Sequence, residues 1–404
     1  MSRVLAPYRR DEPPCGSARA AGSGSRRAQR WLAALALGLL ASPAWAQDIE
    51  RNFAGSAQLD YFAVPTTMPA RPLGFDGFTT ELSLKVAVDF TERLSANIKI
   101  CYGCHGFETD MAYVDLRVAD ELNFRVGRMN PSFGDFPLRH DPANHKANSK
   151  PLPYDMGRML RRDEWNMSVL PSPYVDNGLE INGTHWFGDD VQLDYAAYIV
   201  SGLKGSPDGT DLDFIQSRSG SLYYVDNNSE PAFGGRVALT LNFSDNVNAT
   251  LGGSGMYGHY DPTASLGYFI AGADLYLRIE QLSVRAEYLL RRTEMALGDN
   301  PEAKFRYQFT DPSKSFFVKD GFYVEAELPI LPVLEAFARF DGLRRAGNVP
   351  VNSGLRSKSA VLRYTAGLNL IIFQGLRIKL SGEFWDFSDF KDEVGLHLGV
   401  VANF

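Results

Sequence analysis

Two cysteines and a histidine stand in the pattern C-x-x-C-H at Cys101, Cys104 and His105. Thiols at this spacing can each form a thioether bond to one vinyl group of a haem, and the histidine that follows can bind the iron as an axial ligand. A haem bound in this way exchanges single electrons. The sequence therefore predicts one covalently attached haem c, with Cys101 and Cys104 as attachment points and His105 as the proximal ligand.

Two other chemistries fit part of the same motif. The third cysteine is Cys15, so Cys101 and Cys104 are the only cysteines after residue 46, and in an oxidising compartment they could form a small disulfide. Zinc would need four ligands, and no second pair of cysteine or histidine residues has the spacing to supply them. Haem attachment and a structural disulfide remain as the alternatives at this motif.

The sixth ligand of a haem iron is predicted to come from the long segment 130–176. Met156 is the first candidate, because it follows a proline-rich approach that resembles the distal loop of small c-type cytochromes. His145 is the second; a methionine ligand would raise the reduction potential and a histidine would lower it. Further candidates are His140, Met159 and Met129, and an open sixth position is also compatible with the sequence.

The same segment has a basic middle. Between positions 139 and 162 the basic residues outnumber the acidic Asp141 and Asp155, and two arginines stand just before the segment. A constriction lined by these cations would favour anions, or the cations could pair with haem propionates. The residues expected to set this bias are Arg125, Arg128, Arg139, Lys146, Lys150 and Arg158. Acidic residues flank the block, so a solvated loop tip is the alternative.

The segments that must position these residues show apolar and polar side chains that alternate with a period of two residues. From Leu82 to Phe90, apolar side chains alternate with polar ones, which gives a strand one side for lipid and one for water. About 16 such segments alternate with short turns and longer loops, as in outer-membrane barrels. They are 52–63, 79–90, 94–102, 110–118, 122–129, 177–187, 191–200, 232–243, 246–258, 267–279, 282–292, 320–329, 332–342, 358–371, 375–385 and 393–404. The predicted fold is an all-β transmembrane antiparallel barrel, with the segment 130–176 folded into it.

The predicted strand 94–102 decides on which side of the barrel wall a haem could lie. If Ile98 and Ile100 face lipid, then Lys99 and Cys101 face the lumen, because alternate side chains point to opposite faces. A haem on Cys101 would then lie inside the barrel, toward the outer vestibule.

Residues 1–46 are predicted to be a secretory signal peptide. Three arginines precede the apolar run 31–41, and Ala44 and Ala46 form an A-x-A cleavage pattern. The remaining chain, 47–404, has no apolar run of about 18 residues, so it would cross a membrane as strands. Removing this leader, which holds seven arginines and two acidic residues, changes the formal charge from −7 to −12. The acidic balance argues against nucleic acid as a partner.

Over its predicted mature length the chain resembles the 16-stranded outer-membrane porins. The segment 395–404 ends in Phe404, like the sorting signal of that superfamily. The segment 123–133, NFRVGRMNPSF, is similar to the strand-to-loop step of phosphate-selective porins, except that Ser132 separates the proline from the phenylalanine. The resemblance implies a protein in contact with outer-membrane lipid, inserted by the barrel-assembly machinery and assembled as a homotrimer.

A haem motif in a barrel also resembles, in concept, the porin-cytochrome fusions of iron-oxidising bacteria. In those fusions the motif precedes the first strand, whereas here two predicted strands precede Cys101, so iron oxidation does not carry over. The leading hypothesis is electron transfer at or across the outer membrane, with periplasmic redox carriers or an external electron donor as partners. The alternative is a passive porin for small anions with a Cys101-Cys104 disulfide. A haem sensor or enzyme with an open iron is a third hypothesis.

Overall fold

A computed structural model of the chain describes the part that forms the barrel. The described residues are 50–64, 77–103, 106–155, 168–170, 172–205, 214–215, 226–295, 315–347, 356 and 358–404. They belong to the unit Ile49–Phe404. The predicted signal peptide 1–46 lies outside the described residues, so the boundary at 47 stays a prediction.

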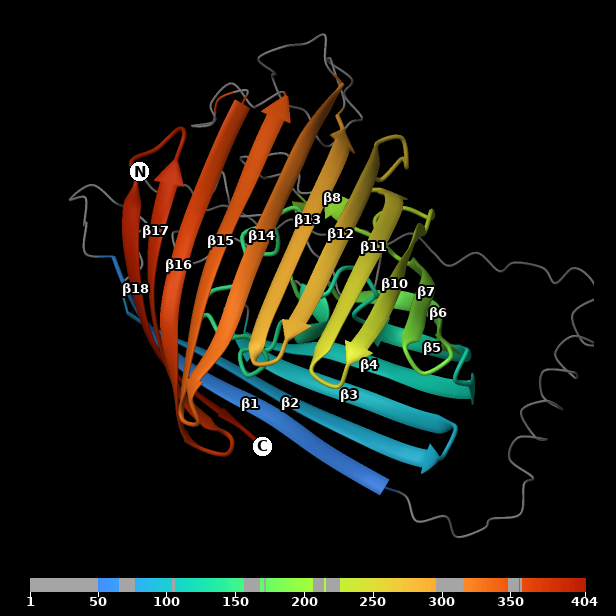
Figure 1. The fold of residues 1–404 in the computed structure, drawn as a ribbon. Helices are drawn as coiled ribbons and strands as arrows, with labels where there is room; N and C mark the ends of the chain where they lie inside the picture. Colours follow the sequence, from blue (N-terminus) through green and yellow to red (C-terminus); the bar gives the residue numbers. More distant parts are fainter. Residues whose placement is uncertain are drawn as a thin grey trace, which may run out of the picture. The chain divides into compact units, whose positions relative to one another are not determined.

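The described residues form a closed antiparallel barrel of 16 strands, which confirms the predicted fold class (Figure 1). Each strand pairs with the next barrel strand along the chain, and the first strand pairs with the last to close the barrel. The barrel strands are β1 (Glu50–Ala63), β2 (Gly77–Thr91), β3 (Leu94–Gly103), β4 (Gly106–Ala119), β5 (Leu122–Met129), β6 (Asp176–Phe187), β7 (Val191–Val200), β10 (Ala232–Ser244), β11 (Val247–His259), β12 (Gly267–Ile279), β13 (Leu282–Glu294), β14 (Phe316–Leu331), β15 (Leu334–Gly347), β16 (Lys358–Phe373), β17 (Leu376–Phe387) and β18 (Glu393–Asn403).

Three short elements are not part of the barrel wall. The strands β8 (Lys204–Gly205) and β9 (Phe214–Ile215) pair with each other, and η1 (Phe136–Arg139) is a 3-10 helix. In the part of the chain that the structure describes, no helix is long and apolar enough to cross a membrane.

The predicted strand bounds need correction mainly at β14 and β15. The segments predicted as 320–329 and 332–342 extend to Phe316–Leu331 and Leu334–Gly347. Pro329 suggests a turn, but it lies within the end of β14, where the pairing with β15 shifts register between Pro329 and Leu331. A proline is tolerated at such an irregularity because it has no backbone N–H to donate to the ladder.

The two faces of the barrel wall differ as the alternation predicts. On β3, Ile98 and Ile100 are 51% and 44% exposed on the outer face, whereas Lys99 is 2% exposed. Cys101 follows Lys99 by two residues, so it lies on the same, lumen-facing side of the strand. The predicted register of the motif strand is therefore confirmed.

Short turns and long connections lie at opposite ends of the barrel. Within the described residues seven short turns join strand pairs at the end where β1 begins, since Glu50 pairs with Asp89 next to the turn after β2. Two of these turns contain Gly188 and Gly375 with φ of 70° and 88°, a conformation that glycine adopts without steric cost. The segment between β5 and β6 begins and ends at the other end of the barrel. In outer-membrane barrels the longer loops are at the external end, so we call this the external end.

The described parts of the segment between β5 and β6 fold into the lumen, as predicted. Its apolar side chains pack with inward-facing residues of the wall in one buried cluster. The members from the segment include Phe133, Phe136, Leu152 and Tyr154, and those from the wall include Tyr198, Ile270, Leu289 and Tyr323. Burying a large apolar side chain stabilises by about 1.5–3 kcal/mol, so this cluster holds the segment firmly. We call residues 130–155 the lumen loop.

Candidate functional site

Of the three chemical residues of the haem motif, only Cys101 lies within the described residues. Cys101 lies near the external end of β3 and faces the lumen, where its neighbours across the ladder are Ser83 on β2 and Glu108 on β4. Cys104 and His105 lie outside the described residues. Neither haem attachment nor the alternative disulfide is tested, and both stay predictions. Within the described residues no cluster of three or more His, Cys, Asp or Glu side chains is arranged to bind a metal ion.

The lumen loop reaches the motif strand through His140. The Nζ atom of Lys99 on β3 lies 3.0 Å from Nε2 of His140, and Nδ1 of His140 lies 2.6 Å from the carbonyl oxygen of Pro137. Because Nδ1 donates to this carbonyl, Nε2 carries the lone pair that accepts from Lys99. Lys99 also forms ion pairs with Asp110 at 2.9 Å and Asp141 at 2.6 Å. A sequence-predicted ligand candidate is thus engaged by a cation two residues from Cys101.

The other predicted iron ligands lie elsewhere. His145 is 2% exposed, its Nδ1 lies 2.8 Å from the carbonyl oxygen of Ala147, and its ring packs 5.7 Å from that of Phe136. Burial, together with the nearby cations of Lys379, Lys150, Arg139 and Arg339, lowers the pKa of His145 well below its ordinary value. Met129 is fully buried in the apolar cluster. Met156 and Met159 lie outside the described residues.

The predicted anion-selective cations are mostly paired. Arg125 on β5 donates to Asp115 at 2.8 Å and lies 3.5 Å from Glu180, and Arg139 pairs with Asp135 at 2.8 Å. Lys146 donates to both carboxylate oxygens of Glu335, at 2.8 and 2.7 Å. Arg128 donates to the carbonyl of Thr109 and Lys150 to that of Ser172, and Arg158 lies outside the described residues. In each ion pair the two opposite charges largely cancel each other's field. The effect of these cations on ion selectivity stays a prediction.

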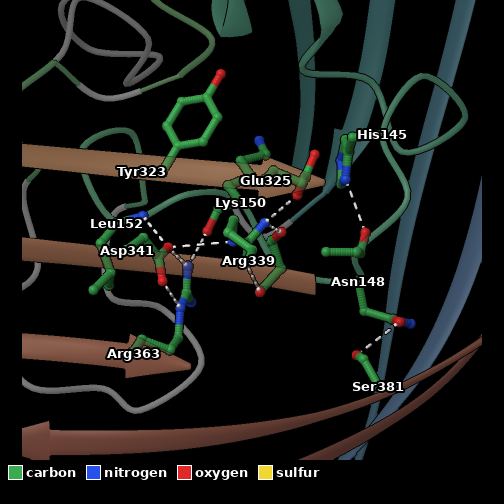
Figure 2. A network of polar contacts seen from close by, with 12 residues as sticks. His145, Asn148, Lys150, Leu152, Tyr323, Glu325, Arg339, Asp341, Arg363 and Ser381 are labelled. Atoms are coloured by element: carbon green, nitrogen blue, oxygen red, sulfur yellow. Dashed lines mark hydrogen bonds and ion pairs between the residues drawn. The ribbon is translucent and has the colours of Figure 1, made fainter. Parts of the chain in front are cut away.

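A buried ion network fastens the lumen loop to the wall formed by β14, β15 and β16 (Figure 2). Arg363 on β16 and Asp341 on β15 pair at 2.5 Å, and both side chains are fully buried. Asp341 also accepts the backbone N–H of Leu152 at 2.8 Å, and Arg339 donates to the carbonyl of Ser149 at 3.0 Å. The charged side chains of the wall therefore bind the loop backbone as well as each other.

A second set of contacts fastens the loop to β1, β17 and β18. The ammonium of Lys379 donates to the carbonyl oxygens of Pro142, His145 and Ala147, at 2.6, 2.7 and 3.4 Å. Asn148 donates to Asp60 at 2.7 Å, and Asp60 lies 2.8 Å from Nδ1 of His397. Arg363 and Lys379 were not among the functional residues predicted from the sequence. Their inward positions in predicted strands were a signal, but the backbone groups they meet depend on the path of a distant loop.

Next to this fastened side, a cavity of about 460 Å³ lies between the loop and the wall of β1 to β5. The loop contributes Pro137, Leu138 and Asp141 among others, and the wall contributes Lys85, Tyr113 and Arg125 among others. The guanidinium of Arg125 lies 4.5 Å from the centre of the Tyr113 ring. This is a cavity of small-molecule size lined by both apolar side chains and several polar groups.

Lys85 is the cavity residue that sequence reasoning missed. It lies half-buried on the lumen face of β2 and pairs across the ladder with Lys99. Among the described residues Lys85 forms no hydrogen bond or ion pair. Its inward position in the alternating segment Leu82 to Phe90 was a usable signal. The sequence carries no signal that Lys85 lacks a partner, because the pairing of a lysine depends on which acidic residues the folded loop brings near it.

Comparisons with known proteins agree with this architecture. The sequence matches no known protein family and no curated protein. The structure is similar to the outer-membrane channel DcaP of Acinetobacter baumannii, with a TM-score of 0.55 and 12% identity over 88% of this chain and 97% of that one. It is also similar to OmpF of Salmonella typhi, with a TM-score of 0.53 and 12% identity over 88% of this chain and 98% of that one. An anion-selective porin of Comamonas acidovorans is similar as well, with a TM-score of 0.51 and 11% identity over 88% of this chain and 100% of that one. The chain has a porin fold.

The porin fold, with its apolar outer face, places the protein in a bacterial outer membrane, as predicted. At 11–12% identity the similarity shows the fold and carries no solute or cofactor with it. The predicted homotrimer, the assembly machinery and the redox partners stay predictions.

Proposed function

We propose that the protein is an outer-membrane channel through which small solutes diffuse, with a preference for anions. The cavity of about 460 Å³ between the lumen loop and the wall of β1 to β5 carries this proposal. The loop is fastened to the wall of the barrel by buried contacts such as Arg363 with Asp341. Solutes would therefore pass through the cavity that this fixed loop leaves beside it.

The preference for anions rests on Lys85. The other cations of the cavity wall, Lys99 and Arg125, are paired with Asp110 and Asp115 at 2.9 and 2.8 Å. Lys85 has no such partner among the described residues, so its charge acts on passing ions. This assigns the selectivity to a different residue from the loop cations that the sequence favoured.

Reversal potentials across planar lipid bilayers test this function. With a KCl gradient we expect the wild-type channel to pass chloride better than potassium, and Lys85→Glu to reduce that ratio about threefold or more. Arg93→Glu is the matched control, because Arg93 has the same charge but lies exposed in the turn after β2. Equal reversal potentials for the two variants would exclude the cavity as the conducting path.

A second candidate function, electron transfer through a covalent haem, is favoured by the position of Cys101 on the lumen face of β3. Cys101 and Cys104 would hold the haem and His105 would ligate it, and the group would supply one-electron chemistry. Haem staining of the purified protein on a denaturing gel tests this, because only a covalent haem remains attached. Staining lost in Cys101→Ala and Cys104→Ala would support the haem, and an unstained wild-type protein would leave the diffusion channel alone.

A further inference from the structure

We propose that the cavity beside the lumen loop is a binding site for small monocarboxylates with a compact apolar body, and that Lys85 binds the carboxylate. This inference rests on the proposed channel function and names its solute class. The charge of Lys85, the hydroxyls beside it and the apolar side of the cavity support it.

The first step concerns charge. Lys85 pairs across the ladder with Lys99 on β3 and with Ala54 on β1, so no acidic residue is opposite it in either neighbouring strand. Directly opposed like charges repel. Lys99 is held by Asp110 and Asp141, whereas Lys85 forms no ion pair among the described residues. A carboxylate bound beside Lys85 would supply the missing anion.

The acidic side chain that lines the cavity, and the two beside Arg125, are already paired. Asp141 on the loop accepts a hydrogen bond from the ammonium of Lys99 at 2.6 Å. Asp115 and Glu180 contact Arg125 at 2.8 and 3.5 Å. Each of these carboxylates lies close to a cation, so its repulsion of a bound carboxylate is reduced.

Two hydroxyls lie one step along the wall from Lys85. Ser56 on β1 and Ser83 on β2 line the cavity, and their oxygens are 2.9 Å apart. One hydroxyl hydrogen is used in the bond between them. The second hydroxyl hydrogen is available to a carboxylate oxygen, since a serine donates one hydrogen bond and accepts two. Lys85 and this hydroxyl together form a site for one carboxylate.

Part of the remaining lining of the cavity is apolar, next to polar side chains such as Asn130 and Asn144. Met111 on β4 and Pro137, Leu138 and Ala143 on the loop contribute side chains without polar hydrogens. A volume of about 460 Å³ holds a single aromatic or branched aliphatic ring with its carboxylate and some water. Inorganic phosphate would leave the apolar wall uncovered and would meet one unpaired cation where it needs several. The cavity therefore favours an organic carboxylate over a mineral anion.

Two measurements test the site. Titration calorimetry of the full-length protein in detergent micelles measures binding, and block of the chloride current in planar bilayers measures occupancy of the channel. The probes are benzoate, its neutral analogue benzamide, acetate and inorganic phosphate. We expect benzoate to bind at least about tenfold more tightly than the other three. We expect Lys85→Met to weaken benzoate binding by about 10- to 100-fold, Lys85→Arg to retain most of it, and Arg93→Met to leave it unchanged. Leu138→Asn should weaken benzoate but not acetate.

Each outcome decides the proposal, and folding is checked by heat-modifiable migration on gels. If chloride current flows but benzoate binds no better than benzamide, or equally well to Lys85→Met, the carboxylate site is wrong and the channel stands. If phosphate binds best, the site is a mineral-anion site and the proposal is wrong. If benzoate binds to Lys85 but no current flows, the site stands and the diffusion function fails. If Lys85→Met fails to fold, the preference of the wild-type protein and of Lys85→Arg for benzoate over benzamide decides, because equal binding of the two probes would contradict the site.

Discussion

The ammonium of Lys379 on β17 donates to the carbonyl oxygen of His145 at 2.7 Å, and both side chains are buried. Two more loop carbonyls surround the same ammonium, so a single lysine orders a turn of the lumen loop. This contact makes the position of the loop depend on one side chain of the wall.

The first prediction concerns this lysine. Lys379→Met should lower the free energy of unfolding by about 2–4 kcal/mol, because buried carbonyl groups lose their donor. The loosened turn should also increase current noise in single channels. Lys391→Met, at an exposed position before β18, is the control and should change neither quantity. A quiet channel of wild-type stability in Lys379→Met would show that the loop does not depend on the ammonium.

The second prediction concerns the buried pair of Arg363 and Asp341. Arg363→Met should lower the free energy of unfolding by about 3–5 kcal/mol, because Asp341 and its acidic neighbours would remain buried with less positive charge near them. Arg344 pairs with Asp320 at 2.5 Å on the outer face and is 59% exposed, so Arg344→Met should cost less than about 1 kcal/mol. Urea unfolding in phospholipid vesicles measures both, and similar losses for the two variants would contradict the assigned difference.

The third prediction is a pH dependence from His145. Its pKa in the folded protein lies well below its ordinary value, whereas in the unfolded chain it is about 6.5. Below about pH 6.5 the unfolded chain binds a proton that the folded loop excludes, so this contribution lowers stability as the pH falls and vanishes above that range. His145→Asn should remove up to about 1.4 kcal/mol per pH unit of acid destabilisation.

Urea titrations at pH 5 and pH 7.5 measure this dependence. His185→Asn is the control, since the His185 side chain is 45% exposed near a short turn. The assignment to His145 fails if the two variants change the pH dependence equally.

The fourth prediction concerns Lys146 and Glu335, which neutralise each other at 2.7–2.8 Å. Lys146→Met should expose the charge of Glu335 and shift the reversal potential toward cations. Lys358→Met, on an exposed position of β16, removes an equal charge without freeing an acidic partner. An equal shift in both variants would mean that only net charge matters and that the pair has no local effect.

The strands of this barrel were predictable because the physical rule that makes them is local. Lipid on one side and polar surroundings on the other impose alternation along every strand, so β5 and β7 were predicted with the bounds they have. The placement of Cys101 on the lumen face followed from the same rule. At β14 the rule was obscured by Pro329 and by charged inward residues, and there the predicted bounds were short.

The candidate site was less accessible to such reasoning. The C-x-x-C-H motif and the basic middle of the loop were visible in the sequence, but charge alone does not show which cation is neutralised. Arg125, Arg139 and Lys146 gain partners that lie up to 189 positions away in the chain, whereas Lys85 gains none among the described residues. Lys85, the cavity cation without a partner among the described residues, was therefore not among the predicted ones.

The sequence by itself determined the fold class, the strand count and the face on which Cys101 lies, because each depends on neighbours one or two residues away. Only the tertiary structure decided that His140 meets Lys99, that Lys379 and Arg363 fasten the loop, and that a cavity remains beside Lys85. These contacts arise where a loop crosses a closed barrel. Their energies depend on burial and on partners brought together by closure, which no local pattern records.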